Sequence, residues 1–161
     1  MSNVQSMLAL GALIVLSLIS FNFNSAVLSS STVNVENKVA LTAISLGDDV
    51  LEEIKGKSFD ETTTKFPTTN PASLTPAGNL GPDSGEVYPN FNDVDDFNGY
   101  TETVSAPHAE NYNVSCIVQY VDSSNVDNVS ATQTFYKKAT VTVTSPYMNY
   151  DVVLSFVYTL K

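Results

Sequence analysis

Apolar residues form a nearly unbroken run from Met7 to Phe23, which is about the length a helix needs to cross a bilayer. Beyond this run, apolar residues from Val27 to Ile54 recur at mixed three- and four-residue steps, the spacing of one helix face. No proline occurs before Pro67, and Gly56 stands where a helix would end. The pattern therefore predicts one long helix from about Ser2 to Lys55.

Such a helix would be roughly 80 Å long at 1.5 Å per residue, far longer than a small domain is wide. We therefore expect its first half to project from the globular part of the molecule. A projecting apolar helix requires cover, either from lipid or from other copies of itself.

The segment from residue 58 to residue 98 has a different character. Prolines and glycines interrupt every possible element, and threonine is frequent, as in Thr62-Thr63-Thr64. We interpret the segment as a long loop wrapped over the domain surface. Its hydroxyl and proline content permits O-glycosylation, with an unmodified solvated loop as the alternative.

The last part of the chain alternates in the manner of β-strands. Strand-length segments dense in β-branched and aromatic residues cover Tyr112–Val121, Phe135–Thr144 and Val152–Leu160, and Gly99–Val104 is a shorter candidate for an edge strand. In the second of these, Ala139, Val141 and Val143 share one face, whereas Lys138 and the threonines share the other. We expect the final strand to be the most buried of the three.

Together these patterns predict an α+β protein. The apolar side of an antiparallel sheet would pack on the second half of the helix, around Val39 to Ile54. The expected organisation is a long helix over residues 1–57 and a globular head over residues 58–161, with the loop region at 58–98 and the sheet at 99–161.

Composition excludes several function classes. The formal net charge is -10 and arginine is absent, so nucleic-acid binding through a basic patch is not expected. The single cysteine, Cys116, excludes an internal disulfide framework and a cysteine-built zinc site. It alternates in phase with Val114 and Val118, which predicts a small buried hydrophobic side chain.

A long apolar N-terminal helix, a loop and a terminal antiparallel sheet resemble the type IV pilins and the pilin-like pseudopilins of type II secretion. Two segments carry the resemblance: the strand that begins Phe135-Tyr136-Lys137-Lys138 and the acidic stretch from Asp93 to Tyr100 before the sheet. The resemblance implies a subunit made with a short basic leader and cleaved by a prepilin peptidase. It further implies membrane embedding before assembly, and then an extracellular filament built by inner-membrane machinery on a prokaryotic cell surface.

This resemblance gives a reason for the missing basic flank, because no lysine precedes Lys38. We expect that a leader was removed or never existed. Family members usually carry a glutamate at the fifth mature position, which neutralises the terminal amine of a neighbouring subunit. If Met1 is the first mature residue, Gln5 takes that place and supplies a hydrogen bond without a charge.

Assembly without catalysis is the predicted mechanism, with the chain as its own partner in a helical homopolymer and no cofactor. Burial of large apolar side chains around a common axis would supply the cohesion. The expected filament interface consists of Met7, Leu8, Leu10, Leu13, Ile14, Leu16, Leu18, Ile19, Phe21 and Phe23. Alternatives are a minor pilin or pseudopilin of a secretion or DNA-uptake machine, and a membrane-anchored surface adhesion domain.

One segment resembles a ligand site. Asp93, Asp95, Asp96 and Asn98 provide clustered oxygens just before Gly99, as calcium loops do. The alternative is a turn that Phe97 and Tyr100 anchor in the core. No catalytic residue is expected: the only histidine, His108, has no suitable nucleophile near it in sequence and is interpreted as a surface loop residue.

Overall fold

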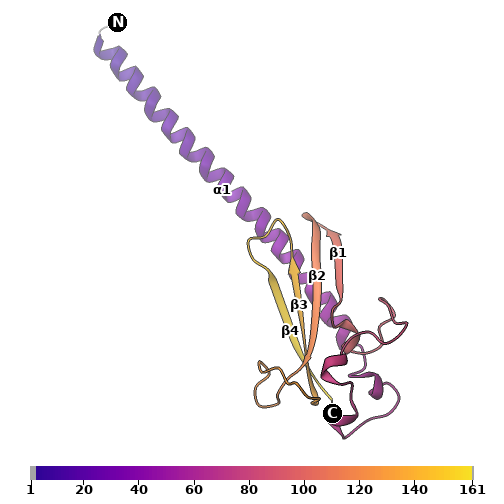
Figure 1. Ribbon diagram of the computed structural model, residues 1–161. Coiled ribbons are helices and arrows are strands. Elements are labelled where there is room, and N and C mark those ends of the chain that lie inside the picture. Colours follow the sequence, from indigo (N-terminus) through magenta and orange to yellow (C-terminus); the bar gives the residue numbers. More distant parts are fainter. Residues whose placement is uncertain (1–2, 161) are drawn as a thin grey trace. The chain divides into compact units, whose positions relative to one another are not determined.

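The computed structural model describes residues 3–160 and confirms the α+β class. A long helix, α1, covers Asn3–Lys55, and four short 3-10 helices follow it before a four-stranded antiparallel sheet (Figure 1). The 3-10 helices are η1 (Glu61–Thr63), η2 (Pro71–Ser73), η3 (Ala77–Asn79) and η4 (Asp95–Phe97), and the strands are β1 (Thr101–Ala106), β2 (Ala109–Tyr120), β3 (Tyr136–Thr144) and β4 (Val152–Thr159).

Two compact units make up the chain, and the division falls inside α1, between Lys38 and Val39. The first unit is the N-terminal part of α1. The second comprises the C-terminal part of α1, the segment of 3-10 helices and the sheet. The predicted helix is thus present, whereas the compact head begins within α1, because the residues after Val39 pack on the sheet.

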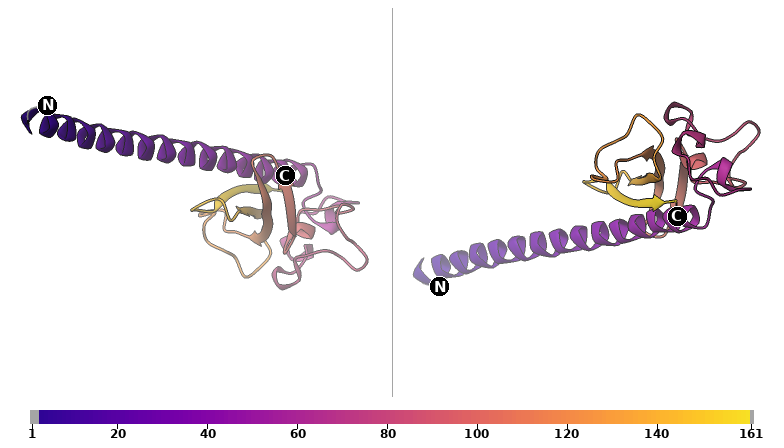
Figure 2. Two further views of the ribbon diagram at one scale, coloured as in Figure 1. Left: turned by 90° about the horizontal axis from the view of Figure 1, so that it is seen from above. Right: turned by 90° about the horizontal axis from the view of Figure 1, so that it is seen from below.

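The C-terminal part of α1 is amphipathic. Its buried residues are spaced three or four apart and form one stripe: Val39, Ala40, Ala43, Gly47, Leu51 and Ile54. Figure 2 shows this part of the helix along one face of the sheet. Gly56 follows the last turn and Lys55 suits the negative end of the helix dipole, as the sequence predicted.

The sheet has the order β1-β2-β3-β4 with antiparallel neighbours throughout. Its inner face is the one predicted from alternation, because Ala139, Val141 and Val143 are fully buried while the threonines between them are half-buried. Cys116 and Val118 of β2 join them in the same core, so Cys116 is the buried hydrophobic side chain expected. The predicted edge strand is also present, as β1.

The expectation that the final strand would be the most buried is wrong. Val153 is 57% exposed and Phe156 is 40% exposed. The physical reason is the position of β4 at the edge of the sheet, where it has one neighbour instead of two. Only Val152 of this strand is buried, and Leu154 and Tyr158 pack against the core from its margin.

Gly47 allows close contact between α1 and the sheet. A Cβ atom added there would lie 3.0 Å from Leu154 Cδ1 and 3.4 Å from Val143 Cγ2. A side chain larger than that of alanine would have to displace both neighbours.

We therefore predict that Gly47→Leu lowers the free energy of unfolding by about 1–3 kcal/mol, the usual cost of overpacking a core. Denaturant unfolding of the full chain in detergent, followed by tyrosine circular dichroism, measures the change. Gly78→Leu is the control, since a Cβ atom at Gly78 meets nothing within 4 Å. Equal stability of the two variants would contradict the close packing at Gly47.

Candidate functional site

The ten residues predicted as a filament interface all lie on the N-terminal part of α1. Every one of them is exposed, from 58% for Leu18 to 74% for Met7. No charged residue occurs between Asn3 and Val35. This part of α1 therefore carries a large apolar surface that nothing else in the described chain covers.

The apolar surface extends around the whole circumference of the helix. Leu13, Ile14, Val15 and Leu16 are consecutive, so their side chains point in four directions about 100° apart. Each is at least 56% exposed. A helix that is apolar on all sides is found in a membrane or in the interior of an assembly.

Three polar side chains in this unit bond to carbonyl groups of the preceding helical turn. Ser17 donates to the Leu13 carbonyl at 2.8 Å, Thr32 to Leu28 at 3.1 Å, and Asn34 to Ser30 at 2.9 Å. Such bonds to the preceding turn reduce the cost of placing these groups in apolar surroundings. The helix contains a window of mean hydropathy 2.1, long and apolar enough to cross a membrane. Gln5 lies near its start, on the exposed surface.

A second notable site lies inside the head, where Lys137 of β3 is completely buried. Its Nζ donates to Asp95 Oδ1 at 2.6 Å, to Asp60 Oδ2 at 2.9 Å and to the Phe59 carbonyl at 2.7 Å. The side chains of Asp60 and Asp95 are 0% and 3% exposed. We call these three residues, together with Asp93 beside them, the Lys137 cluster.

The Asp60 carboxylate is held as an anion. Its Oδ1 accepts from the amide and hydroxyl of Thr62, and its Oδ2 accepts from the Thr75 amide, the Tyr120 hydroxyl and Lys137. Burial alone would raise the pKa of Asp60, but Lys137 and these donors outweigh it and lower the pKa below its ordinary value.

Asp93 is in the opposite situation. Its Oδ1 accepts from the amides of Asp95 and Asp96 at 2.9 and 3.2 Å, and the residue is 2% exposed. Burial and the nearby charge of Asp95 raise the pKa of Asp93 to about 9. This carboxyl group is therefore protonated at neutral pH.

The acidic stretch is a turn anchored in the core, and the structure does not arrange its oxygens as a calcium site. Asp93 and Asp96 accept backbone amides, Asp95 pairs with Lys137, and Asn98 Oδ1 accepts the Val118 amide at 3.0 Å. Phe97 is fully buried and Tyr100 is 8% exposed, as the alternative interpretation requires. In the part of the chain that the structure describes, no group of three His, Cys, Asp or Glu side chains could hold a metal ion.

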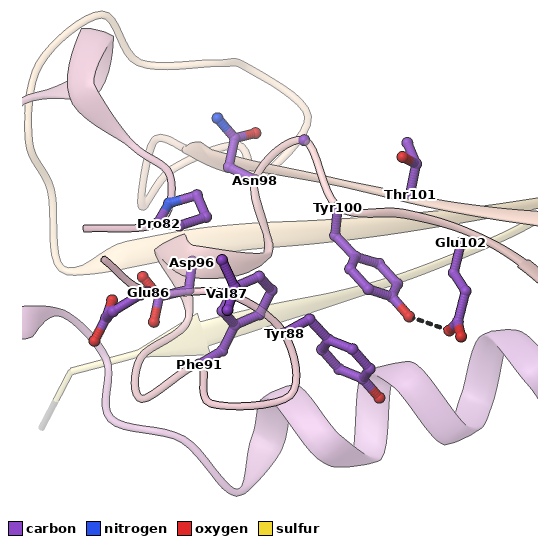
Figure 3. A pocket seen from close by; sticks show the side chains of 11 residues that line it. Pro82, Glu86, Val87, Tyr88, Phe91, Asp96, Asn98, Tyr100, Thr101 and Glu102 are labelled. Carbon is purple, nitrogen blue, oxygen red and sulfur yellow. Dashed lines mark hydrogen bonds between the residues drawn. The ribbon is translucent and has the colours of Figure 1, made fainter. Parts of the chain in front are cut away.

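Beside this turn lies a cavity of about 360 Å³ (Figure 3). Tyr88, Phe91 and Tyr100 form one side of it, with ring centroids 5.0 to 6.4 Å apart. Carboxyl groups of Glu86, Asp96 and Glu102 also line it, and Tyr100 donates to Glu102 as Figure 3 shows. Its acidic rim suits a cation better than an anion.

His108 lies in the two-residue turn between β1 and β2, exposed and with φ of 76°. The prediction that His108 is a surface loop residue is confirmed. Burial raises the pKa of the Cys116 thiol to about 12, so this side chain is un-ionised at neutral pH.

Sequence reasoning missed Lys137 and Asp60. A signal for Lys137 existed, because it alternates in phase with Ala139, Val141 and Val143 and so belongs to the buried face. Asp60 gave a weaker signal as an N-cap before Thr62 and Thr63.

Comparison with protein-family models, with characterised proteins and with solved structures gives no match.

Removing the Lys137 ammonium group should leave two buried carboxylates without a counter-ion and so lower the stability of the head. We predict that Lys137→Met lowers the free energy of unfolding by about 3–5 kcal/mol, because Asp60 and Asp95 lose their counter-ion in the core. The matched control is Lys138→Met at the next position, whose partner Asp127 is 79% exposed, and which should change stability far less. Similar losses in both variants, measured by denaturant unfolding, would contradict the role of the Lys137 cluster.

Asp93 should make stability depend on pH. Between pH 3.8 and about 9 the folded chain keeps this proton while the unfolded chain releases it, so its contribution to stability falls as pH rises, by up to about 1.4 kcal/mol per pH unit. Asp93→Asn imitates the protonated group and keeps the acceptor for Asp95 and Asp96. While Asp95 is an ionised carboxylate, the variant should therefore be more stable than the parent at pH 8, with the difference narrowing toward pH 4. A difference independent of pH would exclude this titration.

Proposed function

We propose that this chain is a structural subunit of an extracellular, type IV pilus-like filament on a prokaryotic cell surface. In the filament the N-terminal parts of α1 pack together around a common axis, and the heads face the medium. The observation that supports this most strongly is the apolar surface all around α1 from Met7 to Phe23.

The contrast between the two parts of α1 favours this function. After Val39 the helix has one apolar stripe, and one sheet covers it. From Met7 to Phe23 large apolar side chains point in every direction, so a single partner surface would leave most of them in water. Packing among several identical helices, or surrounding lipid, covers all sides.

The free-energy cost of releasing an assembled subunit into water is large. Full burial of a Leu, Ile or Phe side chain is worth about 1.5–3 kcal/mol, and the predicted interface contains ten large apolar residues. Even partial burial of this set gives each subunit far more than thermal energy. The helix thus needs no charged contact for cohesion.

Before assembly, the same segment would lie in the membrane, where its backbone groups are satisfied inside the helix. The resemblance to pilins supplies the remaining steps of the proposal: cleavage of a leader by a prepilin peptidase, and extraction into the growing filament by inner-membrane machinery. No catalysis by this chain is involved.

A second candidate is a membrane-anchored surface domain. It is favoured because one apolar segment of this length is enough to span a bilayer. A minor pilin or pseudopilin would share the fold and differ in abundance. Electron microscopy of sheared surface fibres with mass spectrometry separates them: abundant fibres of this chain select the filament subunit, trace amounts in mixed fibres the minor pilin, and absence from fibres the anchored domain.

A charged side chain in the core of the filament should prevent assembly. We predict that Leu13→Lys, or separately Leu16→Lys, abolishes filaments, because each subunit would bury an unpaired ammonium group. The head should stay folded, since both positions lie outside its compact unit. Counting fibres by electron microscopy measures the loss.

Ile117→Lys provides the control, because Ile117 is 54% exposed on the sheet and the substitution adds the same charge to the head. Filaments of this variant should form at the parent level. Normal filaments from Leu13→Lys would refute the assignment of the helix to the filament core.

A further inference from the structure

The Lys137 cluster brings an amine and a carboxyl group into contact where no water reaches them. Lys137 Nζ lies 2.6 Å from Asp95 Oδ1, and the two side chains are 0% and 3% exposed. The rings of Phe59 and Tyr120 flank Nζ, with centroids 4.6 and 5.2 Å away. The bare ion pair is costly in such surroundings, because both charges have left water.

We propose that Lys137 and Asp95 condense into an intramolecular amide bond, an isopeptide link between β3 and η4. A bond forms between Lys137 Nζ and Asp95 Cγ, one Cγ–O bond breaks, and one molecule of water leaves. The ammonium and carboxylate charges disappear together, so the reaction needs no oxidant, reductant or other reactant. This inference does not depend on the proposed filament function.

The two neighbouring carboxyl groups match the needs of this reaction. Asp60 is an anion 2.9 Å from Nζ and can accept a proton from the ammonium, which frees the nitrogen lone pair for attack. Asp93 lies beside Asp95, whose backbone amide donates to Asp93 Oδ1 at 2.9 Å, and it carries a proton at neutral pH that can pass to the departing oxygen. Base, nucleophile, electrophile and acid thus follow one another in the order Asp60, Lys137, Asp95, Asp93.

All protons in this condensation are accounted for. Two of the three ammonium protons leave with the departing oxygen as water, relayed through Asp60 and Asp93, and the third stays on the amide nitrogen. Both relay groups return to their starting protonation states. They act as catalysts within the chain.

Asp95 is a better electrophile than Asp60. Five donors hold Asp60 as an anion, including the Thr62 and Thr75 amides and the Tyr120 hydroxyl, and an anion so stabilised resists attack. Among the described residues, the structure places one hydrogen-bond donor on the Asp95 carboxylate, Lys137 at 2.6 Å, so this carboxylate is less strongly stabilised as an anion. The Lys137 contact to Asp95 is also the shorter of the two.

The link would join two parts of the head that are far apart in sequence. It would fasten the turn before the sheet to a central strand, so the segment from residue 58 to residue 98 could not peel away from the sheet under load. It would also replace a buried ion pair by a neutral amide, which removes the desolvation cost of both charges.

Intact mass measurement of the folded full chain, followed by peptide mapping, tests this proposal. The expected result is a mass lower than the sequence mass of the mature chain by one water molecule. Mapping should place the loss on a branched peptide that contains Lys137 and Asp95. A full sequence mass, with Lys137 and Asp95 recovered on separate unmodified peptides, would overturn the proposal.

Variants identify the reacting carboxyl group. Asp95→Asn should lose one ammonia in place of water, because the amide nitrogen is then the leaving group, whereas Lys137→Met should keep its full mass. Lys138→Met, the control, should still lose one water molecule. A link from Lys137 to Asp60, or an unchanged mass loss in Lys137→Met, would overturn the assignment to Asp95.

Discussion

The exclusion of apolar surface from water is the constraint on which this molecule depends. Large side chains surround the helix from Met7 to Phe23 on every side, and the described chain leaves them exposed. This segment has no charged side chain through which a partner could bind it, and it has no free strand edge. Its backbone groups are already hydrogen-bonded within the helix. The function of the N-terminal part of α1 depends on what covers that surface. The cover is lipid, the same helix of other copies, or lipid first and other copies after assembly.

One continuous helix meets this constraint in two different ways. From Met7 to Phe23 apolar residues lie all around the helix, whereas from Val39 onward the buried residues form one stripe that the sheet covers. Gly47 lets the helix approach Leu154 and Val143 closely. The head is therefore built on part of the same helix that carries the uncovered surface. Every charged residue, from Glu36 onward, follows the uncharged part of the helix.

Much of the fold could be predicted from the sequence because its signals are local. Alternation assigned Ala139, Val141 and Val143 to one face, and three- and four-residue spacing assigned the helix. Strand order is not local, so the edge position of β4 and the exposure of Val153 were missed.

The head's internal site was harder to predict. The acidic stretch could be recognised in the sequence. Its partner Lys137 is distant in sequence and was not predicted, because lysines are usually exposed. Alternation did carry that information, since Lys137 shares the phase of three buried residues. The cavity beside Tyr88 and Phe91 depends on an irregular segment, for which no periodic signal exists.

Cryo-electron microscopy of the purified full-length chain without detergent tests the central claim most directly. We expect helical polymers in which residues 3–38 lie against the same residues of neighbouring copies along the axis. A dispersed, water-soluble monomer that retains those residues intact would contradict the account.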